Sequence, residues 1–69
     1  RRVDALEKTA LPEASEALRL ATLSYAEGRA TLLELLDAQN AYTATRTALT
    51  DARLALALAT AELGRIAAR

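Results

Sequence analysis

The chain has 69 residues, 52% of them hydrophobic, and it lacks Phe, Trp, Met, Cys and His. Nine basic residues balance nine acidic ones, so no net charge indicates a nucleic acid or another highly charged partner. Disulfides and metal or nucleophile sites built on Cys or His are excluded. The hydrophobic residues are mostly Ala and Leu, and alanine buries little surface. We therefore expect a chain of this size to need partners for its stability.

The first part of the chain has the apolar spacing of a helix. Intervals of three and four separate Leu11, Ala14, Leu18, Ala21 and Tyr25, and upstream Val3, Leu6 and Ala10. Pro12 has no backbone donor and clashes with the preceding turn. We expect a helix over about residues 1–27, with a kink or break near residues 11–12 and Pro12 in the first turn of any restarted helix.

A glycine interrupts this pattern. Gly28 is suited to the left-handed conformation that ends a helix. Thr31 and Glu34 match the capping box, in which each side chain satisfies a backbone amide at the start of the next helix. The residues predict a tight turn over 28–31 between antiparallel helices, and they require nothing more than a turn.

The second part predicts a long helix over about residues 32–67. Its three-four repeat comprises Leu35, Ala38, Tyr42, Thr45, Leu49, Ala52, Leu56, Ala59, Leu63 and Ile66. A second stripe comprises Ala41, Ala44, Ala48 and Ala55, and a third Leu54, Ala57, Ala61, Gly64 and Ala68. Several apolar stripes favour contacts on more than one side, as in a bundle or a closed wall of helices. The alternative is that alanine serves only as a good helix former on a solvated face.

These elements predict an all-α fold. We expect the whole chain, residues 1–69, to be one antiparallel helical hairpin of the coiled-coil type, with a long second helix. Uncharged runs such as Leu54 to Ala61 fall far short of the ~20 residues that span a membrane. No direct membrane span is expected in this segment.

The candidate chemistry is sparse. Glu34 and Asp37 lie three positions apart on one helical face, but no third group joins them and a narrow hairpin offers no pocket. Arg46 and Arg53 share a face that is otherwise mostly Thr, and we interpret them as a solvated or partner-facing stripe rather than a nucleic-acid site. We expect no enzyme activity, no cofactor, no metal site and no nucleic-acid partner.

One segment resembles a known family. From Leu11 to Ile66 the sequence is similar to the second periplasmic helical hairpin of TolC-like outer-membrane efflux proteins, and most similar to the cobalt–zinc–cadmium-type cation branch. The residues that carry the resemblance are Leu11-Pro12, Ala17-Leu18, Tyr25, Gly28, the block "LLELLDAQ" from Leu32 to Gln39, and Glu62-Leu63. The combination is fairly specific, although each piece alone is weak in a helix rich in Ala and Leu.

The resemblance implies a trimeric parent protein whose helical hairpins form a tunnel in the periplasm. This chain would then be the periplasmic portion of an outer-membrane protein and a fragment of the channel, since it contains one hairpin and no barrel strands. It implies a periplasmic adaptor and an inner-membrane pump as partners. The turn would be the adaptor-docking tip, comprising Tyr25, Glu27, Gly28, Arg29, Ala30 and Thr31, and Asp37 and Gln39 would make helix contacts just above it.

A different class of function fits the same residues. The chain is then a purely structural coiled-coil hairpin that self-associates into a helical bundle and has no transport role. The two readings differ at the turn, because a scaffold needs only a cap whereas a docking tip needs side chains that a partner recognises. In isolation we expect the hairpin to self-associate through its Ala/Leu faces.

Overall fold

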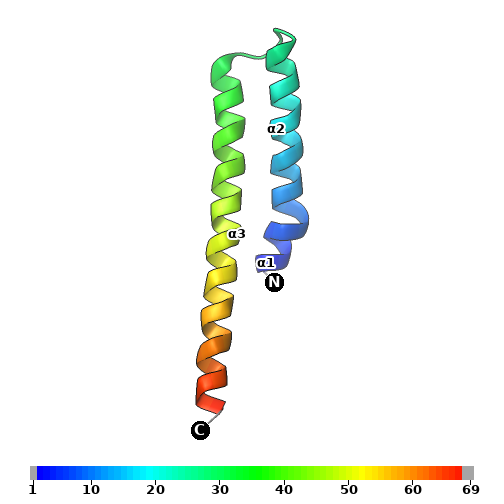
Figure 1. The fold of residues 1–69 in the computed structure, drawn as a ribbon. Coiled ribbons are helices and arrows are strands. Elements are labelled where there is room, and N and C mark those ends of the chain that lie inside the picture. Colours follow the sequence, from blue (N-terminus) through cyan, green and yellow to red (C-terminus); the bar gives the residue numbers. More distant parts are fainter. Residues whose placement is uncertain (1, 68–69) are drawn as a thin grey trace.

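The computed structural model describes residues 2–67 and contains two helical stretches joined by a short turn (Figure 1). The first stretch consists of α1 (Arg2–Ala5), the π-helical segment η1 (Leu6–Ala10) and α2 (Leu11–Ala26). The second is the single helix α3 (Leu32–Ala67). No strand occurs within residues 2–67, so the prediction of an all-α fold is confirmed.

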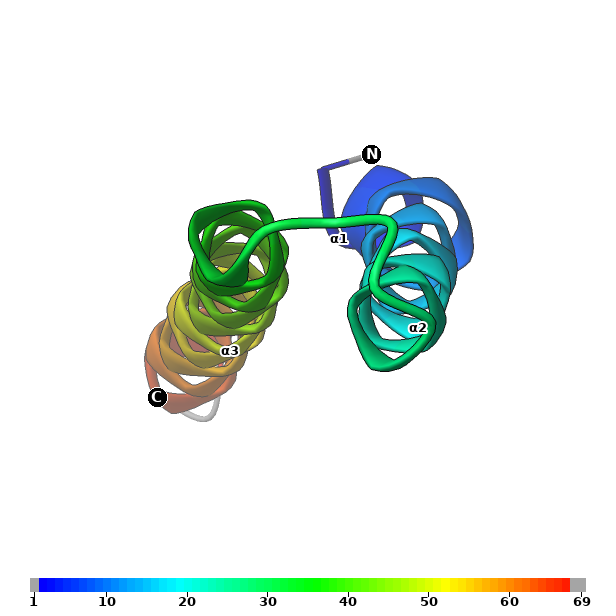
Figure 2. The ribbon, with the colours of Figure 1, turned by 90° about the horizontal axis from the view of Figure 1, so that it is seen from above.

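The molecule is a narrow rod. Its Cα atoms extend over 62 × 17 × 12 Å, and their radius of gyration is 17.2 Å, whereas a compact domain of this length would have a radius of about 11 Å. The turn brings α3 back along α2, and the two helices lie side by side in both views (Figures 1 and 2). α3 continues well past the level of α1 (Figure 1).

The apolar repeat identified in the sequence is the face along which the two stretches pack. In α3 the half-buried residues are Leu35, Ala38, Tyr42, Thr45, Ala48 and Ala52, together with Leu49, which is only 4% exposed. On the opposite side they are Val3, Leu6, Ala10, Leu11, Ala14, Leu18, Ala21 and Ser24. We call these two sets the seam. Leu49 is the one buried residue among those whose side chains are described, so the rod has a contact line rather than a core.

Tyr25 was expected at the inner end of this seam, and the structure places it elsewhere. Its side chain is 43% exposed, whereas Ser24 is half-buried. Either residue continues the three-four spacing after Ala21, at a step of three or of four. In the last turn of α2 the residue three positions after Ala21 is therefore the half-buried one, and Tyr25, four positions after it, is exposed.

Pro12 lies in the first turn of α2, and the backbone remains right-handed helical at Ala10 and Leu11. In place of a break the helix widens, because the Leu11 N–H donates to the Leu6 carbonyl five residues back. A proline in a regular α-helix has no N–H to donate and clashes with the carbonyl four residues earlier. A wider turn immediately before Pro12 leaves room for the proline ring and requires no hydrogen bond from the Pro12 nitrogen.

The outer part of α3 has no covering helix within residues 2–67. The seam repeat continues there with Leu56 and Leu63, which are 38% and 69% exposed, and with the exposed Ala59. Of the other two predicted stripes, Ala48 is half-buried, and the exposed members are Ala41, Ala44, Ala55, Leu54, Ala57, Ala61 and Gly64. The side chain of Ile66 and the residue Ala68 lie outside the described part of the chain.

This arrangement leaves much apolar surface in contact with water. The accessible area is 5305 Å², whereas a compact monomer of the same mass would expose about 4,200 Å². Large exposed side chains near the turn include Leu20, Leu23, Leu32, Leu33 and Leu36. Among the described residues, no helix combines the length and the hydropathy that a membrane span requires.

Candidate functional site

The candidate site is the turn between α2 and α3, and its backbone is held by hydrogen bonds at both ends. At the end of α2 the Arg29 N–H donates to the Ser24 carbonyl at 2.8 Å, and the Gly28 N–H donates to the Tyr25 carbonyl at 3.0 Å. This is the pairing of a Schellman motif, in which the residue after the helix takes a left-handed conformation. Gly28 takes it, with φ of +76°. The predicted role of Gly28 is therefore confirmed.

The start of α3 is closed by the capping box. The Glu34 N–H donates to the Thr31 Oγ1 at 3.1 Å, and the Thr31 N–H donates to the Glu34 Oε1 at the same distance. The predicted capping box is therefore confirmed. Ala30 and Leu35 occupy the two positions of a hydrophobic staple, and both are half-buried.

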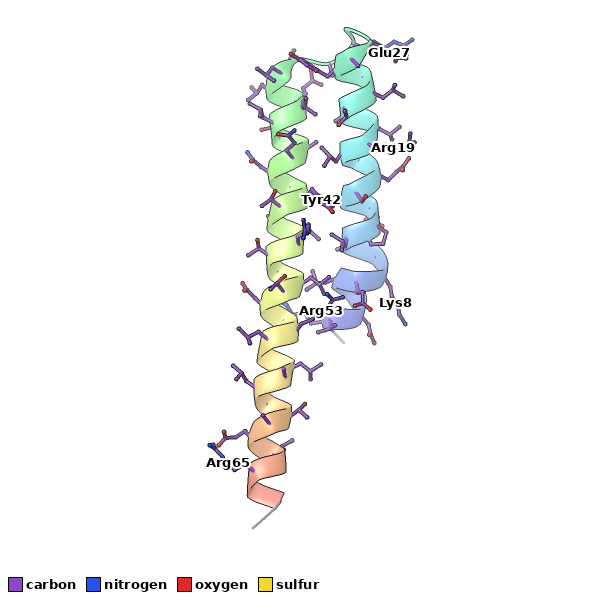
Figure 3. The ribbon with its side chains drawn as sticks, viewed as in Figure 1. Lys8, Arg19, Glu27, Tyr42, Arg53 and Arg65 are labelled. Atoms are coloured by element: carbon purple, nitrogen blue, oxygen red, sulfur yellow. The ribbon has the colours of Figure 1, made fainter. Side chains whose placement is uncertain are left out.

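Most residues of the turn are exposed to solvent. Tyr25, Glu27, Gly28, Arg29 and Thr31 are exposed, and only Ala30 is half-buried. Arg29 Nε lies 3.7 Å from Glu27 Oε1, a loose pair on the surface. Glu27 lies at the end of the rod (Figure 3). The turn thus presents an aromatic ring, an anion and a cation, whereas the Thr31 hydroxyl is engaged with Glu34 in the capping box.

Asp37 and Gln39 lie outside this group. Both are exposed residues in the second and third turns of α3, after the capping box has ended. They lie six and eight positions beyond Thr31, which caps the start of their helix. The structure therefore separates the predicted docking set from the predicted helix contacts.

A further group of polar side chains lies along α3, away from the turn. A shallow hollow of about 250 Å³ is lined by Thr43, Arg46, Thr47, Thr50 and Asp51, all from this helix. The Arg46 guanidinium lies 5.8 Å from the centre of the Tyr42 ring, and Arg53 pairs with Glu7. Figure 3 shows Tyr42 and Arg53 directed toward the first helical stretch, with Lys8 and Arg19 on its outer side.

Glu16 and Arg19 form a bidentate ion pair on the first helical stretch. Arg19 donates to both carboxylate oxygens of Glu16, at 2.9 and 2.6 Å, and this hydrogen bonding lowers the pKa of Glu16 and raises that of Arg19. Both groups are exposed on one helix. No group of three or more carboxylates arranged to hold a metal ion occurs in the described residues.

The chain matches no family model, no curated protein and no solved structure. The site is therefore assessed on its own geometry. Sequence reasoning found Gly28, Thr31 and Glu34, and it missed Ser24. The Ser24 carbonyl accepts hydrogen bonds from both Arg29 and Ala30, the latter at 3.3 Å. Its position could have identified it, because the carbonyl four residues before the left-handed glycine is the hydrogen-bond acceptor in a Schellman motif.

Proposed function

We propose that this chain is a periplasmic tunnel hairpin of a TolC-like outer-membrane efflux channel, with the turn as its adaptor-docking tip in a tripartite efflux system. The observation that carries the proposal is the turn itself. Its backbone is fixed at both ends, while five of its six candidate docking residues remain exposed. A rigid loop loses little conformational freedom when a partner binds it, which favours recognition.

Three further features support the proposal. The motif residues from Leu11 to Leu63 resemble those of the family. The chain is a rod with a narrow seam, as a tunnel wall requires. Leucines remain exposed on both helices near the turn, where a wall places neighbours on either side. In this reading the seam is an antiparallel coiled coil, and Pro12 with η1 marks a kink.

The coiled-coil register has a direct test. The chain lacks cysteine, so a pair introduced at Ala21 and Ala38 reports only on the contact between these two seam positions. We expect Ala21→Cys with Ala38→Cys to form an intramolecular disulfide under mild oxidation. The control pair, Leu23→Cys with Ala38→Cys, moves one thiol to an exposed position. Equal oxidation of both pairs would contradict the proposed register.

Docking is tested in the full-length protein that contains these residues, expressed in cells. Arg29→Glu reverses the charge of an exposed side chain. The backbone N–H at position 29 can still donate to the Ser24 carbonyl and close the Schellman motif. We expect lower export and weaker photo-crosslinking from position 25 to the periplasmic adaptor. Arg46→Glu is the matched control, because Arg46 is exposed but lies far from the turn.

Gly28→Leu adds a second variant, since leucine strains the left-handed position. If export and adaptor cross-linking survive both changes while the trimer remains intact, the docking role is wrong.

The exposed apolar area favours one other function, a structural hairpin that self-associates into a helical bundle without a transport role. The total accessible area, polar and apolar together, exceeds that of a compact monomer by about 1,100 Å², and several large hydrophobic side chains lie within it, so the rod has surface available for an interface of the standard ≈ 800 Å² per partner. Sedimentation of the isolated chain tests self-association, and a stable, folded monomer at micromolar concentration would contradict it. An unchanged export phenotype when the chain's turn is altered would favour this scaffold over the docking tip.

A further inference from the structure

A second repeat of uncharged residues runs along α3 on the side away from α2. Its members are all exposed and recur at steps of three and four: Leu36, Asn40, Thr43, Thr47, Thr50, Leu54, Ala57 and Ala61. Each lies one or two positions after a member of the seam repeat, which is about 100° or about 200° around the helix. The two repeats therefore face in nearly opposite directions. Within residues 2–67 no element covers this side of α3 (Figure 2). We call this second repeat the outer line.

Over residues 37–53, charged residues flank the outer line with a different sign on each side. Arg46 and Arg53 lie on one flank, and Asp37 and Asp51 lie on the other. Arg53 is already paired with Glu7 of the first helical stretch. Neither Arg46 nor Asp51 forms an ion pair within residues 2–67, so both charges are available to a partner.

The hollow on α3 lies between these flanks. It is lined by Thr43, Thr47 and Thr50 of the outer line and by Arg46 and Asp51, one from each flank. When two helices pair, each side chain of the repeat inserts into a hole formed by four residues of the facing helix. Thr43, Arg46, Thr47 and Thr50 enclose such a hole, because they follow one another around one face at offsets of three, four and seven. The hollow is therefore shaped to receive a side chain from a second helix.

We propose that the outer line binds a second copy of this chain, with the two α3 helices parallel and in register. This orientation places the basic flank of each copy beside the acidic flank of the other, so that Arg46 faces Asp51 of the second copy and Asp51 faces its Arg46. An antiparallel pair would place the two basic flanks together. Asn40 lies in the outer line itself, and a polar residue at such a position specifies the register of paired helices.

The parallel dimer rests on the self-association proposed above for the free chain and does not require the channel role. It specifies the face, the partner and the orientation of that self-association. Arg46→Glu should weaken the dimer of the free chain and leave cross-linking from position 25 to the adaptor unchanged, because Arg46 lies far from the turn. The dimer and the docking tip can therefore fail separately.

Two cysteine variants test the position of the interface, since the chain has no cysteine of its own. Ala57 belongs to the outer line, where the parallel pair places it beside Ala57 of the second copy, and Ala55 is exposed but lies off the line. We expect Ala57→Cys to form a disulfide-linked dimer under mild oxidation, at least about tenfold faster than Ala55→Cys. Equal rates for the two variants would overturn the proposal.

Charge variants of the 69-residue chain test the orientation by sedimentation equilibrium. Arg46→Glu places a carboxylate opposite Asp51, and we expect the dissociation constant of the dimer to rise roughly tenfold. Arg46→Glu with Asp51→Arg exchanges the two charges and should restore the original constant. Both variants lose the contact between Arg46 and the Tyr42 ring, so the difference between them reports on the charges.

Two results would overturn the parallel dimer. A tighter dimer for Arg46→Glu would identify an antiparallel pair, in which this change relieves repulsion between basic flanks. A folded monomer at every concentration would exclude the parallel dimer together with the self-associating scaffold.

Discussion

Arg53 of α3 forms an ion pair with Glu7 of η1, 46 positions earlier in the chain. The three other ion pairs in residues 2–67 join side chains two or three positions apart, so this pair alone connects the two helical stretches. Because the chain reverses at the turn, Glu7 opposite Arg53 places Leu11 opposite Leu49. The most buried residue therefore lies where the π turn meets α2.

Removing this ion pair should cost little. Arg53→Ala and Glu7→Ala are each expected to lower the free energy of unfolding by at most about 1 kcal/mol, because both side chains are about half exposed. Urea denaturation of the two single variants and the double variant gives their coupling. The coupling should shrink when salt is raised from 0.05 to 0.5 M. A coupling above about 2 kcal/mol would show that the pair is buried in solution.

Leu49 should be the most sensitive position in the seam. Leu49→Ala removes the one buried side chain, and we expect a loss of about 2 kcal/mol or more in the free energy of unfolding. Leu33→Ala is the matched control, since Leu33 is 67% exposed on the same helix, and its change should stay within about 0.5 kcal/mol. Circular dichroism during urea denaturation measures both. Similar losses for the two variants would contradict the described seam.

Gly28 should be limited by backbone conformation and not by space. A Cβ at this position would meet no atom within 4 Å, but its φ of +76° is unfavourable for an L-residue. We expect Gly28→Ala to cost about 1 kcal/mol, and Gly28→Asn less, because asparagine tolerates the left-handed region. Thermal denaturation ranks the variants. Equal stability of all three proteins would mean that the turn does not hold this conformation in solution.

The capping box should depend on the Thr31 hydroxyl. Thr31→Ala leaves the Glu34 N–H without its acceptor, and we expect a loss of about 1 kcal/mol. Thr31→Ser keeps the hydroxyl and should retain most of the stability. Chemical shifts at the start of α3 report whether the first turn frays. Identical behaviour of the alanine and serine variants would exclude the capping role.

The ionisation of Glu16 should make the free energy of unfolding depend on pH. Hydrogen bonding from Arg19 lowers the pKa of Glu16 in the folded chain, so the folded state binds this proton less readily than the unfolded state. The contribution is complete above the unfolded pKa, about 4.3 for a glutamate, and is lost as the pH falls through the lower folded value. An NMR titration of the Glu16 carboxyl should show this shift. Arg19→Gln should abolish it.

The sequence predicts much of this fold because its signals are local. The capping box and the left-handed glycine each depend on a few neighbouring residues, and the structure has both. The seam of α3 followed from periodicity up to Ala52. Beyond that point Leu56 and Leu63 keep the pattern but are exposed, because burial depends on a covering helix and not on spacing alone.

Other features of the fold depend on contacts with the other helical stretch, and the spacing of residues within one helix does not predict those contacts. Pro12 predicted a kink or a break near residues 11–12, but its position alone does not distinguish either from the widened turn that precedes it in the structure. The sequence repeat assigned Tyr25 to the seam, and this was wrong, because Ser24 is the half-buried residue in the last turn of α2. Of the candidate site, the backbone of the turn was predictable, whereas a docking partner leaves no local signal that spacing reveals.

The doubly closed turn also sets the order in which the molecule assembles. The Schellman motif and the capping box join residues only three to five positions apart, so they form with little loss of loop entropy. Each seam contact farther from the turn then closes a slightly longer loop, so the contacts form in order from the turn outward. The contacts of η1 and α1 with α3 lie farthest from the turn and close last in this order, which corresponds to the low contact order of fast-folding helical proteins.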